Sequence, residues 1–192
     1  MSQKRILLID PGHPALDNGG AVADGVREAD INLSVAMLLG GIMVNEGWEV
    51  HFTRYSNILV ELAYRVRSEH ILRPDLFLSL HCNSVSSPGP HGLEVFTSPG
   101  QTAADPAATA ICNALAAAFP DSRFRGDLSD GDPDKEANYY VLVNTRAPAV
   151  LVEMGFLSNA IERAWLTQRH TQIQIAMALA AGVLGWAAHT KE

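Results

Sequence analysis

The chain alternates short runs of aliphatic residues with longer segments of helical periodicity, and this alternation limits the folds open to it. The first run, Ile6–Ile9, holds four large aliphatic residues in succession. Such a run is too short for a helix and is typical of a strand buried on both faces. Asp10-Pro11-Gly12 ends it with turn chemistry, because Pro fixes φ and Gly frees it. His13 follows directly. The sequence therefore predicts a buried strand that presents a histidine at its carboxyl end.

The rest of the chain repeats this pattern. Asp30 is a suitable N-cap for a helix whose apolar positions recur from Ile31 to Ile42. Asn57 is a suitable cap for a second helix, which Pro74 closes. Strands alternating with helices predict an α/β fold: a mostly parallel twisted central sheet of about six strands, flanked by helices on both faces. The expected strands are 6–9, 48–53, 76–81, 93–97, 139–143 and 149–154, and the further expected helices are 103–119, 159–166 and 171–186.

Length, charge and cysteine content exclude several classes of protein. A chain of 192 residues suits a single domain over residues 1–192. The formal net charge of −7 disfavours nucleic acid, because phosphate binding needs clustered Lys and Arg. No run approaches about 18 uninterrupted apolar residues, so we expect no membrane insertion. The first aliphatic run is too short for a signal peptide. We infer no obligate protein partner.

Three expected strands end in residues that can bind a metal or transfer a proton. His13, His81 and Glu153 stand at these ends, and Glu28 precedes the first long helix. In a parallel sheet the carboxyl ends of the strands share one edge, so these groups could meet there. Two histidines and a carboxylate are the protein ligands of one type of catalytic zinc site. A second carboxylate could then act as general base. Spacing alone does not decide which glutamate binds the metal.

Several motifs together resemble the zinc-dependent N-acetylmuramoyl-L-alanine amidases, the group of bacterial autolysins and phage endolysins. They follow the order of that family over nearly the whole chain. The matching segments are Asp10–His13, Glu28–Leu33, Thr53-Arg54, Arg65, Ser79–Asn83, Pro148–Leu151 and Val152–Asn159.

The resemblance implies one zinc ion held by His13, Glu28 and His81, with Glu153 as the catalytic carboxylate. The implied substrate is peptidoglycan, cut at the amide between N-acetylmuramic acid and L-alanine of the stem peptide. Zinc can polarise an amide carbonyl and supply hydroxide near neutral pH. Glu153 would deprotonate the water and protonate the leaving amine, a double role for which the apolar strand 150–152 should raise its pKa.

Other residues near these motifs are candidates for substrate contact. Asn83, Glu94 and Arg125 are the predicted substrate-binding residues, and Arg125 could bind a stem-peptide carboxylate through its fork of donors. A structural role for Asn83, or a salt bridge for Glu94, explains those two residues equally well. Cys82 points away from its neighbour His81 on a strand, so we interpret it as a small buried thiol.

The segment 121–138 lacks periodicity and carries six acidic residues. Its spacing fails that of a calcium loop, so we expect a solvated surface loop.

Two other functions stay open on the sequence. A zinc carboxypeptidase-like enzyme could use a similar site on a peptide bond. A module that binds cell wall without cutting it could share the fold, although such a module has no use for Glu153. The absence of a recognisable export signal leads us to expect a protein made in the cytoplasm that acts on the cell wall, released as endolysins are or acting in the periplasm or outside the cell.

Overall fold

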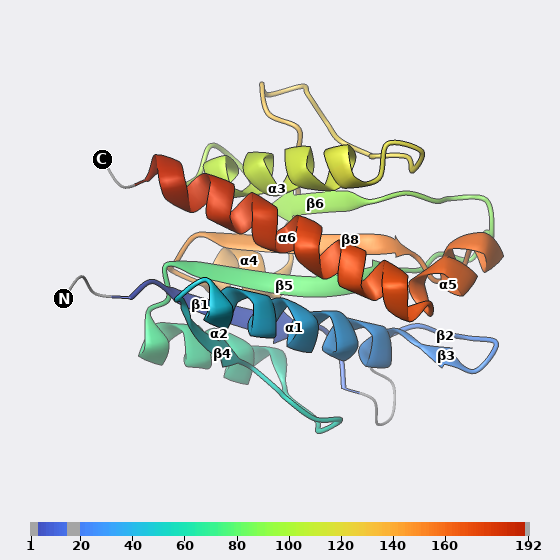
Figure 1. Cartoon of the computed structure of the whole chain (residues 1–192), viewed down its shortest axis with the longest axis horizontal. Helices are drawn as coiled ribbons and strands as arrows, with labels where there is room; N and C mark the ends of the chain where they lie inside the picture. The colour runs from blue at the N-terminus through green and yellow to red at the C-terminus, as the bar shows by residue number, and fades with distance from the viewer. Residues whose placement is uncertain (1–3, 15–19, 191–192) are drawn as a thin grey trace.

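The computed structural model describes residues 4–14 and 20–190 and has one central sheet of six strands (Figure 1). The strand order is β4-β1-β5-β8-β6-β7. The first four strands in this order run parallel, whereas β6 is antiparallel to β8 and parallel to β7. The predicted mostly parallel sheet is confirmed. The strands are β1 (Ile6–Pro11), β4 (Glu49–Phe52), β5 (Leu76–Asn83), β6 (Glu94–Thr97), β7 (Lys135–Glu136) and β8 (Ala149–Phe156), and a separate hairpin pairs β2 (Val22–Ala23) with β3 (Val26–Arg27).

Helices cover both faces of the sheet, as predicted. The three long helices α1, α3 and α6 lie over the face turned toward the viewer in Figure 1, and the shorter α2 and α4 lie behind the sheet. The larger hydrophobic core fills the first interface and the smaller core fills the second. The helices are α1 (Glu28–Asn45), α2 (Leu62–Leu72), α3 (Asp105–Ala118), α4 (Tyr140–Asn144), α5 (Ala160–Leu166) and α6 (Arg169–His189).

Alternation along the strands makes the two faces chemically different. In β5, Leu78 and Leu80 belong to the larger core, whereas Phe77 belongs to the smaller core on the α2/α4 face. Toward the carboxyl ends of the parallel strands, the α2/α4 face becomes polar. The polar residues in this region, spaced by two or four from members of the smaller core, are Asp10, Ser79, His81, Glu94 and Glu153. The face under α1, α3 and α6 is therefore apolar core, and the face under α2 and α4 carries potentially reactive side chains at one end.

Helix α6 is long and apolar enough to cross a membrane by length and composition, with a mean hydropathy of 1.3 in its most apolar window. Within the described residues, 61% of that window is buried inside the protein. Gly182 allows close packing on α3, because a Cβ there would lie 2.7 Å from the Cα of Ile111. Such burial is typical of a core helix. The expected lack of membrane insertion stays a prediction.

Two expectations about helix starts were wrong for one shared reason. Helix α1 begins at Glu28 rather than after Asp30, and α2 begins at Leu62, well after Asn57. The side chains of the two expected caps bind each other instead: Nδ2 of Asn57 donates to Oδ1 of Asp30 over 3.1 Å. Cap propensity indicates a side chain that accepts or donates locally, but it does not say with which partner.

The segment 139–143 was also wrongly predicted, since it forms the short helix α4 rather than a strand. Val141 and Leu142 are adjacent and both buried in the smaller core, which a strand would prevent by pointing them to opposite faces. An apolar run of this length carries too few residues to distinguish the two periodicities.

The acidic segment 121–138 is not simply a solvated loop, because it supplies β7 and a buried carboxylate. Asp134 is 3% exposed, and its Oδ2 accepts a hydrogen bond of 2.7 Å from Oγ1 of Thr97. Its Oδ1 has no partner among the described residues. Burial, together with the nearby carboxylate of Asp132, raises the pKa of Asp134 to about 7 in spite of the bond from Thr97.

We predict that Asp134→Asn stabilises the protein at alkaline pH. The pKa of Asp134 is higher in the folded than in the unfolded chain, so the wild type loses stability as pH rises toward and through 7. The neutral amide still accepts from Thr97 and avoids this loss. The free energy of unfolding should exceed that of the wild type by about 3–4 kcal/mol at pH 8, because each unit of pKa shift corresponds to about 1.4 kcal/mol, and should approach it at about pH 4. Urea denaturation at both pH values, with the exposed Asp130→Asn as control, would reject the idea if the wild type and Asp134→Asn coincide at pH 8.

Candidate metal and catalytic site

The register between β1 and β5 brings two histidines to one edge of the sheet. Pro11 pairs with Leu80, and the amide of Gly12 donates to the carbonyl of Leu80 over 2.9 Å. The rings of His13 and His81 consequently meet edge to face, with centroids 4.8 Å apart. His13 has a φ of +54°, a conformation that is uncommon outside glycine and marks a constrained turn.

Gly12 is required by the position of the His81 ring. A Cβ on Gly12 would lie 2.3 Å from Cε1 of His81, so any larger residue would displace the imidazole. The turn sequence that ends the first strand therefore also makes room for a side chain from the neighbouring strand.

Glu28 lies between the two histidines. The hairpin of β2 and β3 leads directly into α1, and the amide of Ala21 donates to Oε2 of Glu28 over 2.9 Å. Oε1 accepts from Nδ2 of Asn32 at 3.2 Å and from the amide of Cys82 at 3.1 Å. These donors come from the loop before the hairpin, from α1 and from β5. They fix the orientation of a carboxylate that is only 4% exposed.

The donor atoms of His13, Glu28 and His81 fit a metal ion. Oε1 of Glu28 lies 3.4 Å from Nε2 of His13 and 3.1 Å from Nδ1 of His81. One donor atom from each residue falls within 4.8 Å of the others, the one such group found among the described residues. Ligands 2.0–2.2 Å from a tetrahedral zinc ion are about 3.3–3.6 Å apart. The side chains predicted as ligands therefore converge, and the distances from Oε1 of Glu28 to both histidines are close to those between ligands of a zinc ion.

The same contacts determine the charges in this group. Burial alone would raise the pKa of Glu28, but the hydrogen bond from His81 and the charges of both histidines lower it to about 2. Burial lowers the pKa of His13, which favours the neutral ring whose nitrogen lone pair can bind a metal. Glu28 is thus held as a carboxylate, the state in which it can bind a cation.

Glu153 lies beside the histidines on the next strand. It pairs in register with His81 between β5 and β8 and is 8% exposed. Burial raises the pKa of Glu153 to about 7, with Glu28 and Glu94 acting in the same direction, as the sequence analysis expected. Its Oε2 is buried without a hydrogen-bond partner among the described residues. A buried carboxylate oxygen without a partner, next to a potential metal site, is available to a water molecule or a substrate.

The residues predicted to contact substrate form one cluster. Both oxygens of Glu94 are bound: Nδ2 of Asn83 donates to Oε2 at 2.8 Å, and Nε of Arg125 donates to Oε1 at 3.0 Å. Lys135, which the sequence analysis did not single out, donates to the same Oε1 at 2.7 Å. Glu94 is 2% exposed and pairs in register with Glu153. The buried carboxylate of Glu94 therefore serves the protein, while the cations it holds remain partly exposed.

Two buried arginines, Arg54 and Arg65, bind the backbone that leads to His13. Both belong to the segments that resemble the amidases, but no role was predicted for them. Arg54 is fully buried and donates to the carbonyls of Pro11, Gly12 and Ala29. Arg65 donates to Oδ1 of Asp10 at 2.5 Å and to the carbonyl of Pro11. A usable signal was present for Arg65, because it falls among apolar positions of its helix. The structure buries Arg65 and leaves Leu62, on the same helix, 53% exposed.

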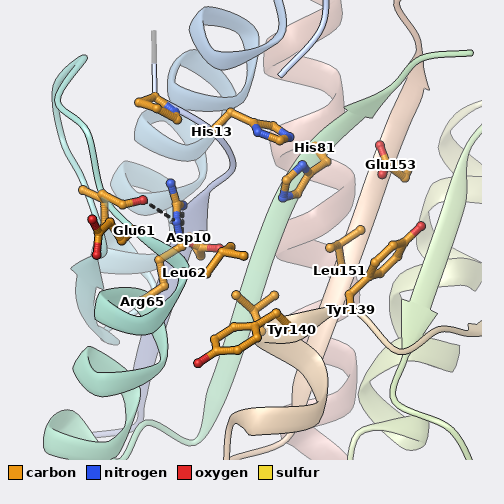
Figure 2. Close-up of a pocket in the computed structure, with 13 residues that line it drawn as sticks. Asp10, His13, Glu61, Leu62, Arg65, His81, Tyr139, Tyr140, Leu151 and Glu153 are labelled. Atoms are coloured by element: carbon orange, nitrogen blue, oxygen red, sulfur yellow. Dashed lines mark hydrogen bonds and ion pairs between the residues drawn. The ribbon is translucent and has the colours of Figure 1, made fainter. Parts of the chain in front are cut away.

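A cavity of about 420 Å³ opens beside these groups between α2 and α4 (Figure 2). His13, His81 and Glu153 lie along its upper end in that view, and Asp10 and Arg65 lie at its α2 side. Cys82 takes no part in it. The thiol is 2% exposed in the larger core on the opposite face, as its strand position predicted.

Comparison with known proteins identifies the family. A sequence profile for N-acetylmuramoyl-L-alanine amidase matches residues 7–184. The chain belongs to this amidase family.

Among curated proteins, the amidase LytC of Bacillus subtilis is 31% identical over 94% of the chain, which covers 35% of LytC. The amidase AmiC of Neisseria meningitidis is 28% identical over 94% of the chain, which covers 52% of AmiC. The chain thus spans a third to a half of the length of these two amidases. The solved structure of amidase AmiC2 of Nostoc punctiforme matches with a TM-score of 0.88 and 29% identity, covering 98% of this chain and 99% of that one.

We predict that Arg54→Met destabilises this amidase domain by about 3 kcal/mol. The change leaves three buried carbonyls without their donor, and each such loss costs part of the desolvation of the carbonyl. Chemical denaturation measures the effect. Arg67→Met, at an exposed position of α2, is the matched control and should change the free energy of unfolding by less than about 0.5 kcal/mol. Equal stability of the two variants would mean that Arg54 does not hold the His13 turn.

Proposed function

We propose that the chain is a single catalytic domain that hydrolyses the amide between the lactyl group of N-acetylmuramic acid and L-alanine of the peptidoglycan stem peptide. Family membership supports the substrate class. The observation that carries the proposal is the convergence of His13, Glu28 and His81 on one point, beside a buried carboxylate with an unpartnered oxygen. The domain would act on the cell wall, either released as endolysins are or working in the periplasm or outside the cell.

One zinc ion would be held by His13, Glu28 and His81. When bound, it would supply a Lewis acid for the amide carbonyl and lower the pKa of a water molecule. Asn32 and the amides of Ala21 and Cys82 would hold Glu28 in its binding orientation, as outer-shell partners do in other metal sites.

Glu153 would move the proton. Its carboxylate would take a proton from the attacking water and return it to the nitrogen of the leaving L-alanine, so that the amine departs neutral. The two roles need a pKa near the working pH, and burial of Glu153 between β5 and β6 raises its pKa in that direction. Asn83 and Arg125, both held by the buried Glu94, would form the rim on the β6 side, with Arg125 in reach of a carboxylate of the stem peptide.

We predict that digestion of purified peptidoglycan releases stem peptides that begin at L-alanine and leaves glycan strands intact. Mass spectrometry of the products identifies the bond. A zinc chelator should stop the release and added Zn²⁺ should restore it. Stem peptides shortened at their far ends would instead indicate a peptidase, and binding to the wall without any product would indicate a binding module.

We predict that Glu153→Gln lowers kcat by about 10²–10⁴-fold, the usual contribution of a positioned acid or base. The amide fills the same volume but cannot take up the proton. Zinc content, measured by elemental analysis, and the thermal unfolding midpoint should stay close to those of the wild type, because Glu153 is not one of the proposed ligands. Normal cleavage by this variant would remove Glu153 from the mechanism.

A further inference from the structure

The two sides of Glu153 differ in chemistry. On the α2/α4 side, the cavity wall is apolar and aromatic. Tyr139 and Tyr140 contribute from the start of α4, and Leu62 faces them from α2 (Figure 2). These three side chains are 39%, 45% and 53% exposed, so their surfaces are available to a ligand. Leu151 and Val60 continue the same wall.

On the β6 side, the rim is cationic. Glu94 stands opposite Glu153 in the antiparallel pair of β6 and β8 and binds both Arg125 and Lys135. The two cationic side chains are 27% and 30% exposed, whereas the Glu94 side chain is 3% exposed. Lys135 also lines a pocket with the acidic residues Asp127, Asp130 and Glu136, whereas Glu94 is the one carboxylate bound by Arg125 among the described residues. Arg125 is therefore the cation with more of its charge available to a ligand.

The guanidinium of Arg125 is held so that it can bind a second anion. Its Nε donates to Glu94, and its plane lies over the ring of Phe156 with Cζ 5.3 Å from the ring centroid. Among the described residues, no hydrogen bond occupies its Nη atoms. A guanidinium with free Nη groups and a fixed plane suits a carboxylate. Glu94 is thus a positioning residue: it fixes both cations and touches no substrate itself.

The glycan and the stem peptide of the proposed substrate differ as the two sides of the site do, one suited to apolar contacts and the other to cations. An N-acetylhexosamine has no charge and offers an apolar ring face and an acetyl methyl group, which pack on aromatic and aliphatic side chains. A stem peptide carries free carboxylates, which are recognised by Arg and Lys. The scissile amide joins these halves, so Glu153 and the proposed metal ligands would stand at their junction.

We propose that the substrate crosses the site in one direction, with the glycan on the Tyr139–Tyr140–Leu62 wall and the stem-peptide carboxylates on Arg125 and Lys135. This inference rests on the proposed amidase function and adds the orientation in which the substrate binds. It makes Tyr140 a determinant of glycan recognition and the cation pair a determinant of peptide charge.

The test uses four soluble muramyl peptides. The stem ends either in a carboxylate or in a carboxamide, and the acyl side is either one N-acetylmuramoyl residue or a longer glycan. For the wild type we expect kcat/KM to favour the carboxylate over the carboxamide about tenfold, the size of one charge-assisted contact. We also expect it to favour the longer glycan. The two ratios measure the two sides of the site separately.

The double variant Arg125→Gln/Lys135→Met should bring the carboxylate ratio to about one and leave the glycan ratio in place. Tyr140→Ala should do the reverse. The matched controls are Arg67→Gln and Tyr64→Ala, two exposed residues of α2 that do not line the cavity, and they should keep both ratios. If the double variant loses the glycan preference and Tyr140→Ala loses the carboxylate preference, the substrate binds in the opposite orientation and the proposal is wrong. Equal loss of both preferences in each variant would also overturn it.

A binding measurement separates this inference from the proposed function. Free stem peptide, with a terminal carboxylate or carboxamide, is titrated into the wild type and the double variant by calorimetry. Weaker binding of the carboxylate form alone to the double variant supports the cationic side without any cleavage, and unchanged binding overturns it. If the wild type cleaves none of the four substrates, the proposed function fails, whatever the binding result.

Discussion

The structure of the site depends on the burial of one carboxylate, that of Glu28. A buried charge is costly unless it is paired and hydrogen-bonded. The donors that satisfy it come from the loop before the hairpin, from α1 and from β5. These segments are far apart in sequence and must therefore assemble in one arrangement around the carboxylate. The same carboxylate lies near both histidines: His81 is next to Cys82 on β5 with its Nδ1 3.1 Å from Oε1 of Glu28, and Nε2 of His13 lies 3.4 Å from the same oxygen.

The two faces of the sheet carry different kinds of side chains. Strand alternation sends leucines and valines to the three long helices, and the same alternation sends Asp10, His81 and Glu153 to the face of α2 and α4. Helix α4 spans only Tyr140–Asn144 and leaves the end of that face open as a cavity. His81 and Glu153 therefore lie on rigid strands where the covering helices are short, while His13 in the turn after β1 and Glu28 at the start of α1 join them at the same edge of the sheet.

The sequence predicts those features that follow from hydrophobic periodicity and from the ends of strands. It does not predict hydrogen bonds between polar groups that are far apart in the chain. The ends of three buried strands identified His13, His81 and Glu153 as neighbours because parallel strands share an edge. No local pattern reveals that Asn57 binds Asp30, or that Arg54 binds carbonyls on either side of the His13 turn. The burial of Asp134 was missed for a similar reason: its acceptor role for Thr97 arises only when β7 joins β6.

Three carboxylates near one edge of this sheet differ only in the partners that surround them. Glu28 accepts hydrogen bonds from the amides of Ala21 and Cys82 and from Asn32, lies 3.1 Å from Nδ1 of His81, and its pKa falls to about 2. Glu94 accepts from Asn83, Arg125 and Lys135, and these bonds outweigh its burial and lower its pKa. Glu153 has a buried oxygen without a partner, and its pKa rises to about 7. Environments that separate the pKa values of neighbouring carboxylates assign them different chemistry. One is fitted to hold a cation, one to organise a rim and one to carry a proton.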